Sequence, residues 1–176
     1  MYNSIIICGL MSSGKTTAAN YIHHQYGYSI VSAGETIKEL ASLSDKTCTR
    51  SQLQEFGSQM LSSFGPIYFA NKLIGKCNRN VVFEGIRPIE VVSYIKGTIN
   101  NSVIIYVKAE AEERLRRFIL SSNQSESMFN EYMSNPLELN VSLIESISDI
   151  VIDNNHEIEA LYLQLDKFLT NESRTF

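Results

Sequence analysis

A glycine-rich segment near the start of the chain constrains the fold more than any other feature. The residues SIIICGLMSSGKTT, at positions 4–17, match the pattern G-x-x-x-x-G-K-[ST] at Gly9, Gly14, Lys15 and Thr16. An apolar run precedes the pattern and a helix-like segment follows it, which is the strand, loop and helix context that the pattern requires. The sequence therefore predicts a phosphate-binding loop between a buried strand and a helix.

The residue types in this loop suit a triphosphate. Backbone N–H groups converge on phosphate oxygens only where side chains leave room, which explains glycine at Gly9 and Gly14. The helix that opens at about Lys15 directs its N-terminal dipole at the β-phosphate. We expect the Lys15 ammonium to reach the β- and γ-phosphates and the Thr16 hydroxyl to hold Mg²⁺. The loop residues expected to bind ATP are Gly9, Met11, Ser12, Ser13, Gly14, Lys15, Thr16 and Thr17.

Length, charge and cysteine content narrow the class of protein. A chain of 176 residues, 44% of them hydrophobic, is long enough for one domain with a core and short for two. A net charge of −4 without a basic stripe argues against a polynucleotide partner. Cys8, Cys48 and Cys77 are odd in number and widely spaced, which favours reduced thiols. Because no apolar run approaches a membrane span and the start lacks a basic signal-peptide region, we expect a cytoplasmic protein with no membrane segment. The sequence carries no signal for an oligomeric state.

Strand and helix signals alternate along the chain. Short apolar runs rich in β-branched residues are typical of strands buried on both faces of a parallel sheet. Such runs occupy residues 5–8, 28–31, 81–84, 103–107 and 150–153. Helical spacing is found over residues 15–26, 35–42, 50–64, 66–74, after position 88, and over 111–120 and 157–169. Polar loops are predicted at residues 43–49 and 121–127, the second as a mobile flap. The alternation predicts right-handed crossovers and a sheet covered by helices on both faces.

Ligands of such sheets bind at the carboxyl ends of the strands, so function is expected in the loops that follow them. In the second of these loops, SAGETIKEL at positions 32–40, Glu35 and Lys38 are one helical turn apart and can face a common pocket. An ordinary helix start with an acid in its first turn and a solvated lysine explains the same residues.

The third loop reads VVFEGIRP at positions 81–88. Glu84 ends the apolar strand, where proteins with this phosphate loop place a carboxylate that organises Mg²⁺ or accepts the proton of the attacking group. Arg87 can bind a phosphate or a carboxylate through two parallel hydrogen bonds. An ion pair between Arg87 and Glu84 or another neighbour is the alternative.

The fourth loop leads into AEAEERLRRF at positions 109–118. Phosphoryl transfer needs cations around the migrating group, and Arg114, Arg116 and Arg117 are the nearest source. Arg114 and Arg117 share one helix face by their spacing, so we favour these two. A solvated face paired with the neighbouring glutamates is the alternative for each arginine.

Together these segments resemble the P-loop nucleotide kinases, nearest to the group related to dephospho-CoA kinase and to phage and archaeal (deoxy)nucleoside monophosphate kinases. The resemblance rests on residues 9–17 and on SAGETIKEL, LQEFGSQMLSSFGPIYFANKLI, VVFEGIRPIEVV, VIIYVKAEAEERLRRF and SDIVIDNNHEIEAL. It implies a single domain over residues 1–176, with the three-layer α/β/α P-loop NTPase fold and a five-stranded parallel sheet in the order 2-3-1-4-5. A helical acceptor-binding insertion at about 35–75 and a short lid at about 118–138 are implied as well.

The resemblance also assigns residues. The acceptor-side element GDxxR of the family falls on Gly34, Glu35 and Lys38, and the loop beside the adenine falls on Asp153 and Asn154. Two departures from the family are visible. Glu84 stands where an aspartate is usual, and residues 119–139 contain no arginine although lids of the family are rich in it. Without a lid cation the rate could fall on the order of 10³-fold.

We therefore expect an ATP-dependent phosphotransferase that moves the γ-phosphoryl of Mg-ATP to a small nucleotide, a (deoxy)nucleoside monophosphate. The expected catalytic residues are Lys15, Glu84, Arg114 and Arg117, and the expected metal ligands are Thr16 and Glu84. The expected acceptor ligands are Gly34, Glu35, Lys38 and Arg87. One alternative is a dephospho-CoA kinase-like enzyme, in which Glu84 would act as base toward a ribose hydroxyl. Others are a non-catalytic ATP-binding or sensing protein and a hydrolase that uses water as acceptor.

Overall fold

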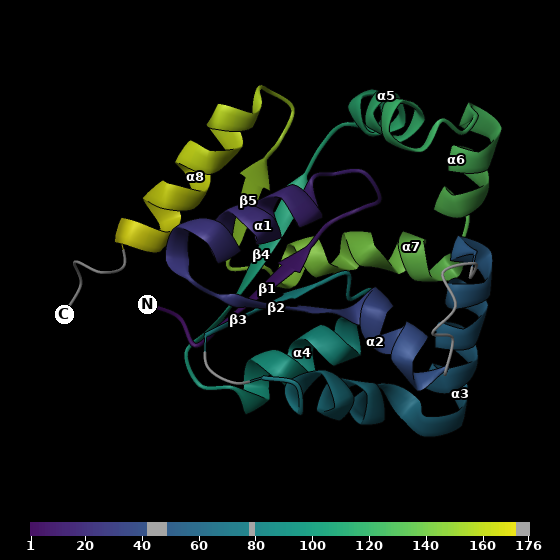
Figure 1. The fold of residues 1–176 in the computed structure, drawn as a ribbon, viewed down its shortest axis with the longest axis horizontal. Helices are drawn as coiled ribbons and strands as arrows, with labels where there is room; N and C mark the ends of the chain where they lie inside the picture. Colours follow the sequence, from purple (N-terminus) through teal and green to yellow (C-terminus); the bar gives the residue numbers. More distant parts are fainter. Residues whose placement is uncertain (42–48, 78–79, 172–176) are drawn as a thin grey trace.

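A parallel sheet of five strands, in the order β2-β3-β1-β4-β5, organises the molecule. The computed structural model describes residues 1–41, 49–77 and 80–171. The strands are β1 (Ser4–Cys8), β2 (Ser29–Ser32), β3 (Val81–Glu84), β4 (Ser102–Lys108) and β5 (Ile150–Asp153). All four pairings between neighbouring strands are parallel. The predicted strand order and the three-layer α/β/α architecture are confirmed (Figure 1).

Helices cover both faces of the sheet (Figure 1). They are α1 (Lys15–Tyr26), α2 (Ala33–Leu40), α3 (Arg50–Ile74), α4 (Ile89–Thr98), α5 (Ala111–Ser122), α6 (Glu126–Met133), α7 (Pro136–Val141) and α8 (Ile158–Asn171), with a 3₁₀ helix η1 at Ser142–Ile147. Every residue of β1 is buried. Ile5 and Ile7 pack with α1 and α8, while Ile6 and Cys8 pack with α3 and α4 on the other face. The unbroken apolar run of β1 follows from this burial on both sides.

Helix α3 breaks where its sequence requires it. Gly65 has a φ of 78°, outside the helical region, and Pro66 resumes the helix because its missing N–H is tolerated in a first turn. The two predicted helical segments, 50–64 and 66–74, therefore match the structure. At the start of α3 the side chains of Thr49 and Gln52 form a reciprocal capping box.

The segment after α5 differs from the sequence-based prediction. Helix α5 extends to Ser122 and α6 begins at Glu126, so the predicted loop over residues 121–127 is wrong at both ends. Helices α6 and α7 and the 3₁₀ helix η1 were not predicted. The Ser125 hydroxyl accepts a hydrogen bond from the Met128 N–H and caps α6. Phe129 of α6 packs on Phe118 of α5, which shows that tertiary contacts stabilise this short helix.

Other expectations can be compared only in part. The helix expected over residues 35–42 ends at Leu40, and the loop expected at 43–49 lies outside the described residues except for Thr49. Cys8 and Cys77 are free thiols. Cys48 lies outside the described residues. Among the helices of the described residues, none combines the length and the apolar character that crossing a membrane requires.

Candidate active site

The loop between β1 and α1 has a backbone that only glycine fits at two points. Gly9 has a φ of 144°, and a Cβ there would lie 2.3 Å from the carbonyl oxygen of Val107. Gly14 has a φ of 102°, and a Cβ there would lie 2.2 Å from Asn154 Nδ2. A side chain at Gly9 would therefore collide with the end of β4, and one at Gly14 with the loop that follows β5. This cradle of backbone between Gly9 and Gly14 has glycine where a phosphate-binding loop needs it.

Lys15 follows Gly14 at the end of the loop, and its ammonium group has a lowered pKa. Its Nζ donates to the Leu10 carbonyl oxygen at 2.7 Å, which holds the side chain over the loop. The Lys15 pKa is lowered to about 8, mainly by burial; the Glu138 carboxylate opposes this shift and the Arg87 guanidinium adds to it. A bound phosphate would raise this pKa, because a nearby negative charge favours the positively charged ammonium form.

Thr16 and Glu84 meet beside the cradle. Register pairs Ile7 of β1 with Glu84 of β3, which brings the end of β3 to the loop. The Thr16 hydroxyl then donates to Glu84 Oε2 at 3.1 Å. A hydroxyl and a carboxylate side by side fit Mg²⁺, which prefers oxygen ligands. Within the described ranges no three His, Cys, Asp or Glu side chains form a metal cage, so phosphate and water would supply the remaining ligands.

Arg117 and Asn154 close the cradle from the side of β5. Arg117 Nη2 donates to the Asn154 carbonyl oxygen at 2.8 Å, and Asn154 Nδ2 donates to the Ser13 carbonyl oxygen at 2.7 Å. Arg117 Nε pairs with Glu113 at 2.7 Å, while its buried Nη1 has no hydrogen-bond partner among the described residues. An ideal Cβ built on Gly14 would lie 4.0 Å from this Nη1. The N–H groups of Nη1 therefore lie next to the phosphate loop.

A hollow of about 500 Å³ continues from Arg117 along the start of α8. Its lining is polar and comes from α5 and from the loop after β5: Glu113, Arg116, Arg117, Asn155, His156, Glu157 and Ile158. Asp153, expected here from the sequence, is exposed and its carboxylate accepts a hydrogen bond from the Asn155 N–H at 3.1 Å.

Arg114 occupies a different environment from Arg117, although both project from α5. It is only 7% exposed and donates from Nε to the Ala109 carbonyl oxygen at 3.1 Å and from Nη1 to the Met11 carbonyl oxygen at 3.5 Å. Its guanidinium also lies over the Phe129 ring, 5.7 Å from the centroid. In this structure the Arg114 guanidinium is therefore engaged with the backbone of Ala109 and Met11, and its expected catalytic role stays a prediction.

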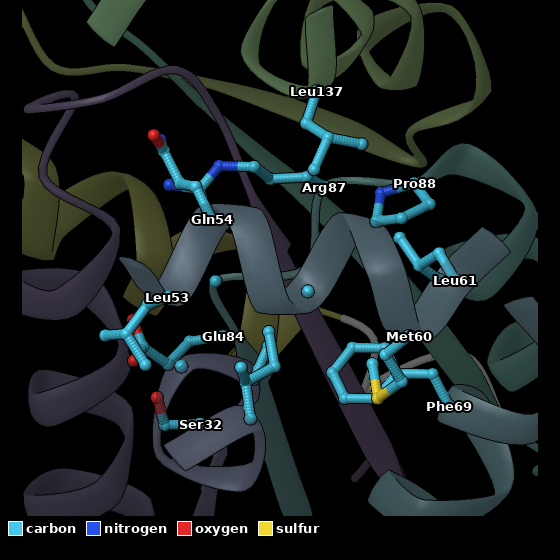
Figure 2. A pocket seen from close by; sticks show the side chains of 15 residues that line it. Ser32, Leu53, Gln54, Met60, Leu61, Phe69, Glu84, Arg87, Pro88 and Leu137 are labelled. Carbon is cyan, nitrogen blue, oxygen red and sulfur yellow. The ribbon is translucent and has the colours of Figure 1, made fainter. Parts of the chain in front are cut away.

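An apolar pocket of about 240 Å³ lies next to the cradle, between α3 and the carboxyl ends of β2 and β3. Helix α3 forms one wall with Leu53, Gly57, Met60 and other residues. Figure 2 shows Ser32 and Glu84 toward one end of the pocket and Met60 and Phe69 toward the other. Because Glu84 also contacts Thr16, the polar end is the one that adjoins the phosphate loop.

The residues expected to bind an acceptor are only partly brought to this pocket. Gly34 and Arg87 line it, whereas Glu35 and Lys38 do not. Lys38 Nζ instead pairs with Glu35 Oε1 at 2.6 Å, one turn away on α2. The alternative from the sequence, a helix start with an acid in its first turn and a solvated lysine, agrees with this partly exposed position, although the lysine pairs with the acid.

Glu138 is a site residue that sequence reasoning missed. It projects from α7, is 2% exposed, and accepts hydrogen bonds from the Met11 N–H at 2.5 Å and from Arg87 Nε at 2.6 Å. A signal was present in the sequence: Glu138 is the only charged residue over positions 132–144 and stands between two leucines. A lone acid on a short apolar helix indicates a buried partner, but nothing in the pattern says which one.

A parallel sheet in the order 2-3-1-4-5 with a phosphate loop after its central strand defines the P-loop kinase class of fold. The family model AAA_17, described as an AAA domain, matches residues 8–132, and the chain belongs to this family. The resemblance to P-loop kinases that the sequence motifs carry is thereby confirmed. A comparison with curated protein sequences found no match.

Solved structures of three kinases share the fold over nearly the whole chain. Shikimate kinase from Acinetobacter baumannii in complex with shikimate is 13% identical with a TM-score of 0.61, covering 99% of this chain and 97% of that one. Shikimate kinase from Aquifex aeolicus is 16% identical with a TM-score of 0.61, at 98% and 99% coverage. A sugar kinase from Janibacter is 13% identical with a TM-score of 0.58, at 97% and 95% coverage. At such identities the likeness shows the fold.

Proposed function

We propose that this protein is a kinase that transfers the γ-phosphoryl group of Mg-ATP to a small nucleotide, a (deoxy)nucleoside monophosphate. The observation that carries the proposal is the position of Glu84. Its carboxylate contacts Thr16 of the phosphate loop at 3.1 Å, and the same residue lines the apolar pocket. A donor held in the loop and an acceptor held in the pocket would therefore meet at one carboxylate.

The chain's own residues would supply positioning and charge. Lys15 and the loop amides would hold the β- and γ-phosphates, and the unused Nη1 donor of Arg117 would face them from the side of α5. An acceptor phosphate oxygen would form a bond to the γ-phosphorus while the bond from the γ-phosphorus to the β–γ bridging oxygen breaks, so that ADP leaves. Bound Mg²⁺, held by Thr16 and Glu84, would neutralise the phosphate charge. Because a phosphate nucleophile is already ionised, this reaction needs little base catalysis.

The shape and chemistry of the pocket support a nucleotide as acceptor. Apolar side chains, among them Met60 and Phe69, line most of it, and these suit a flat base better than a polyhydroxylated ring. Arg87 lines the same pocket and could bind the acceptor's phosphate. At about 240 Å³ the pocket suits a small acceptor and is small for dephospho-CoA with its long pantetheine arm. The shikimate kinases named above supply the other acceptor class to test, a small hydroxy acid.

A second candidate is an ATP-binding protein that does not transfer phosphate. Two observations favour it: residues 119–139 contain no arginine, and the guanidinium of Arg114 is engaged with backbone behind the loop. Under this hypothesis the pocket would serve to bind a signal molecule and not an acceptor.

ADP formation from Mg-ATP distinguishes these functions. The wild-type protein is assayed with a panel of nucleoside and deoxynucleoside monophosphates, dephospho-CoA and shikimate, beside Lys15→Ala and a control, Lys76→Ala, whose ammonium pairs with Glu39 away from the loop. We expect one monophosphate to raise the rate well above the rate without acceptor, with Lys15→Ala silent and Lys76→Ala active. Tight ATP binding with no response to any acceptor would contradict the kinase proposal and favour the second candidate.

A further inference from the structure

The environment of Glu138 couples the phosphate loop to the acceptor pocket. A carboxylate that is 2% exposed is strongly destabilising unless each oxygen has a partner. Here Oε1 accepts from the Met11 N–H at 2.5 Å and Oε2 accepts from Arg87 Nε at 2.6 Å. Burial raises the Glu138 pKa, but the charges of Arg87 and Lys15 and the two hydrogen bonds outweigh it and leave the pKa below its ordinary value. Glu138 is therefore an anion that joins two separate segments.

Arg87 is held through only one of its nitrogen atoms. Glu138 takes Nε, and the two Nη groups make no hydrogen bond with any of the described residues. The side chain is 29% exposed and lines the acceptor pocket, where Figure 2 shows it extended alongside Gln54. The end of the guanidinium thus remains available to bind two oxygens of one phosphate, the geometry in which arginine recognises that group best.

We propose that Glu138 is a positioning residue, which fixes Arg87 so that its free Nη groups bind the phosphate of the acceptor. The inference rests on the proposed function, because it takes the pocket's ligand to be a nucleoside monophosphate. An arginine already ordered by a buried partner loses less conformational freedom on binding. Because the same carboxylate also anchors the Met11 N–H, it fixes the acceptor's arginine relative to the phosphate loop.

The same contacts allow a different role, in which the Glu138 carboxylate occupies the place of a substrate phosphate. A carboxylate near Lys15 and Arg87 could compete with the phosphates of a substrate, and its removal would then strengthen binding. The two roles predict opposite signs for one substitution. A measurement of acceptor affinity therefore decides between them.

The test is a double-mutant cycle on Glu138→Gln and Arg87→Ala, with Glu145→Gln as the matched control. Glu145 lies on η1, outside the site, and pairs with Lys108 at 2.8 Å on the surface. We expect Glu138→Gln to raise the KM of the acceptor by about tenfold or more, with smaller changes in kcat and in the KM of ATP. In the Arg87→Ala background the same substitution should change the acceptor KM by less than about twofold, because its effect passes through Arg87. Tighter acceptor binding, or equal effects in both backgrounds, would overturn the inference.

A measurement without turnover separates this inference from the proposed function. In a ¹H–¹⁵N spectrum of arginine side chains, the Nε–H of Arg87, assigned by its absence in Arg87→Lys, should shift and exchange faster with solvent in Glu138→Gln but not in Glu145→Gln. If the wild-type protein phosphorylates no acceptor, the proposed function fails while this spectrum still tests the contact. Glu138→Asp provides the second variant if the glutamine protein does not fold, with the same direction of change. An Arg87 signal that neither substitution alters would overturn the inference.

Discussion

The Thr16 hydroxyl lies 3.1 Å from Glu84 Oε2, although the two residues are 68 positions apart in the sequence. Glutamate at this position departs from the aspartate that the family resemblance implies, yet its longer side chain still reaches the phosphate loop. The parallel register of β1 and β3 sets this approach, because it places Glu84 beside Ile7 at the end of the central strand. The pair is the part of the site best suited to a divalent cation.

Removing the charge of Glu84 should impair metal-dependent turnover. We expect Glu84→Gln to lower kcat on the order of 100-fold and to raise the Mg²⁺ concentration needed for half-maximal rate, because a neutral amide is a poor ligand for a hard cation. Glu84→Asp keeps the charge and serves as the control, with a smaller loss. A magnesium titration of ADP formation measures both. Full activity in Glu84→Gln would show that this carboxylate has no role in the reaction.

The lowered pKa of Lys15 predicts the pH dependence of ATP use. Lys15 has a pKa of about 8 in the free protein because of burial, so above about pH 8 an increasing fraction is neutral and binds phosphates poorly. We expect kcat/KM for ATP to fall as the pH rises through about 8, and kcat at saturating ATP to hold to higher pH because bound phosphates favour the ammonium form. Rates measured from about pH 6.5 to about pH 9.5 test this. Lys15→Arg stays charged throughout, so the same alkaline fall in that variant would assign the titration to another group.

Glycine at position 14 should be required for space as well as for backbone conformation. A Cβ at Gly14 would lie 2.2 Å from Asn154 Nδ2, whereas one at Gly27, whose φ of 75° is also positive, meets nothing within 4 Å. We expect Gly27→Ala to cost about 1 kcal/mol of unfolding free energy from backbone strain alone. Gly14→Ala should cost more and should also abolish ATP binding. Thermal denaturation and ATP titration of both variants provide the comparison, and equal behaviour would refute the steric argument.

Two adjacent arginines of α5 should differ in their effect on ATP binding. Arg117 contacts the Asn154 carbonyl oxygen beside the phosphate loop at 2.8 Å, while Arg116 is largely exposed and pairs with Glu113. We expect Arg117→Met to weaken ATP binding by about tenfold, because a charged donor near the phosphates is lost. Arg116→Met should leave the dissociation constant within about twofold of the wild type. Equilibrium titration with ATP measures both, and an equal loss in the two variants would argue for a general charge effect.

The elements nearest the phosphate loop were predictable because their signals are local. Burial on both faces explains the apolar run of β1, and the positive φ angles of Gly9 and Gly14 explain why glycine stands there. Helices α6 and α7 were not predicted, since each is only a few residues long and its stability comes from contacts such as that of Phe129 with Phe118. Short helices of this kind have no signal strong enough to compete with that of a polar loop.

The partners of the charged side chains separate what the sequence determined from what the tertiary structure decided. By itself the sequence determined the alternation of strands and helices and the glycine-rich loop, because strand periodicity and the loop motif depend on neighbours along the chain, and the family resemblance implied the strand order that the structure confirms. Only the tertiary structure decided that Arg114 contacts Met11 and that Glu138 pairs with Arg87. A long, flexible side chain can reach many partners, and the one that it takes depends on which distant segments the fold brings within hydrogen-bonding distance and shields from water.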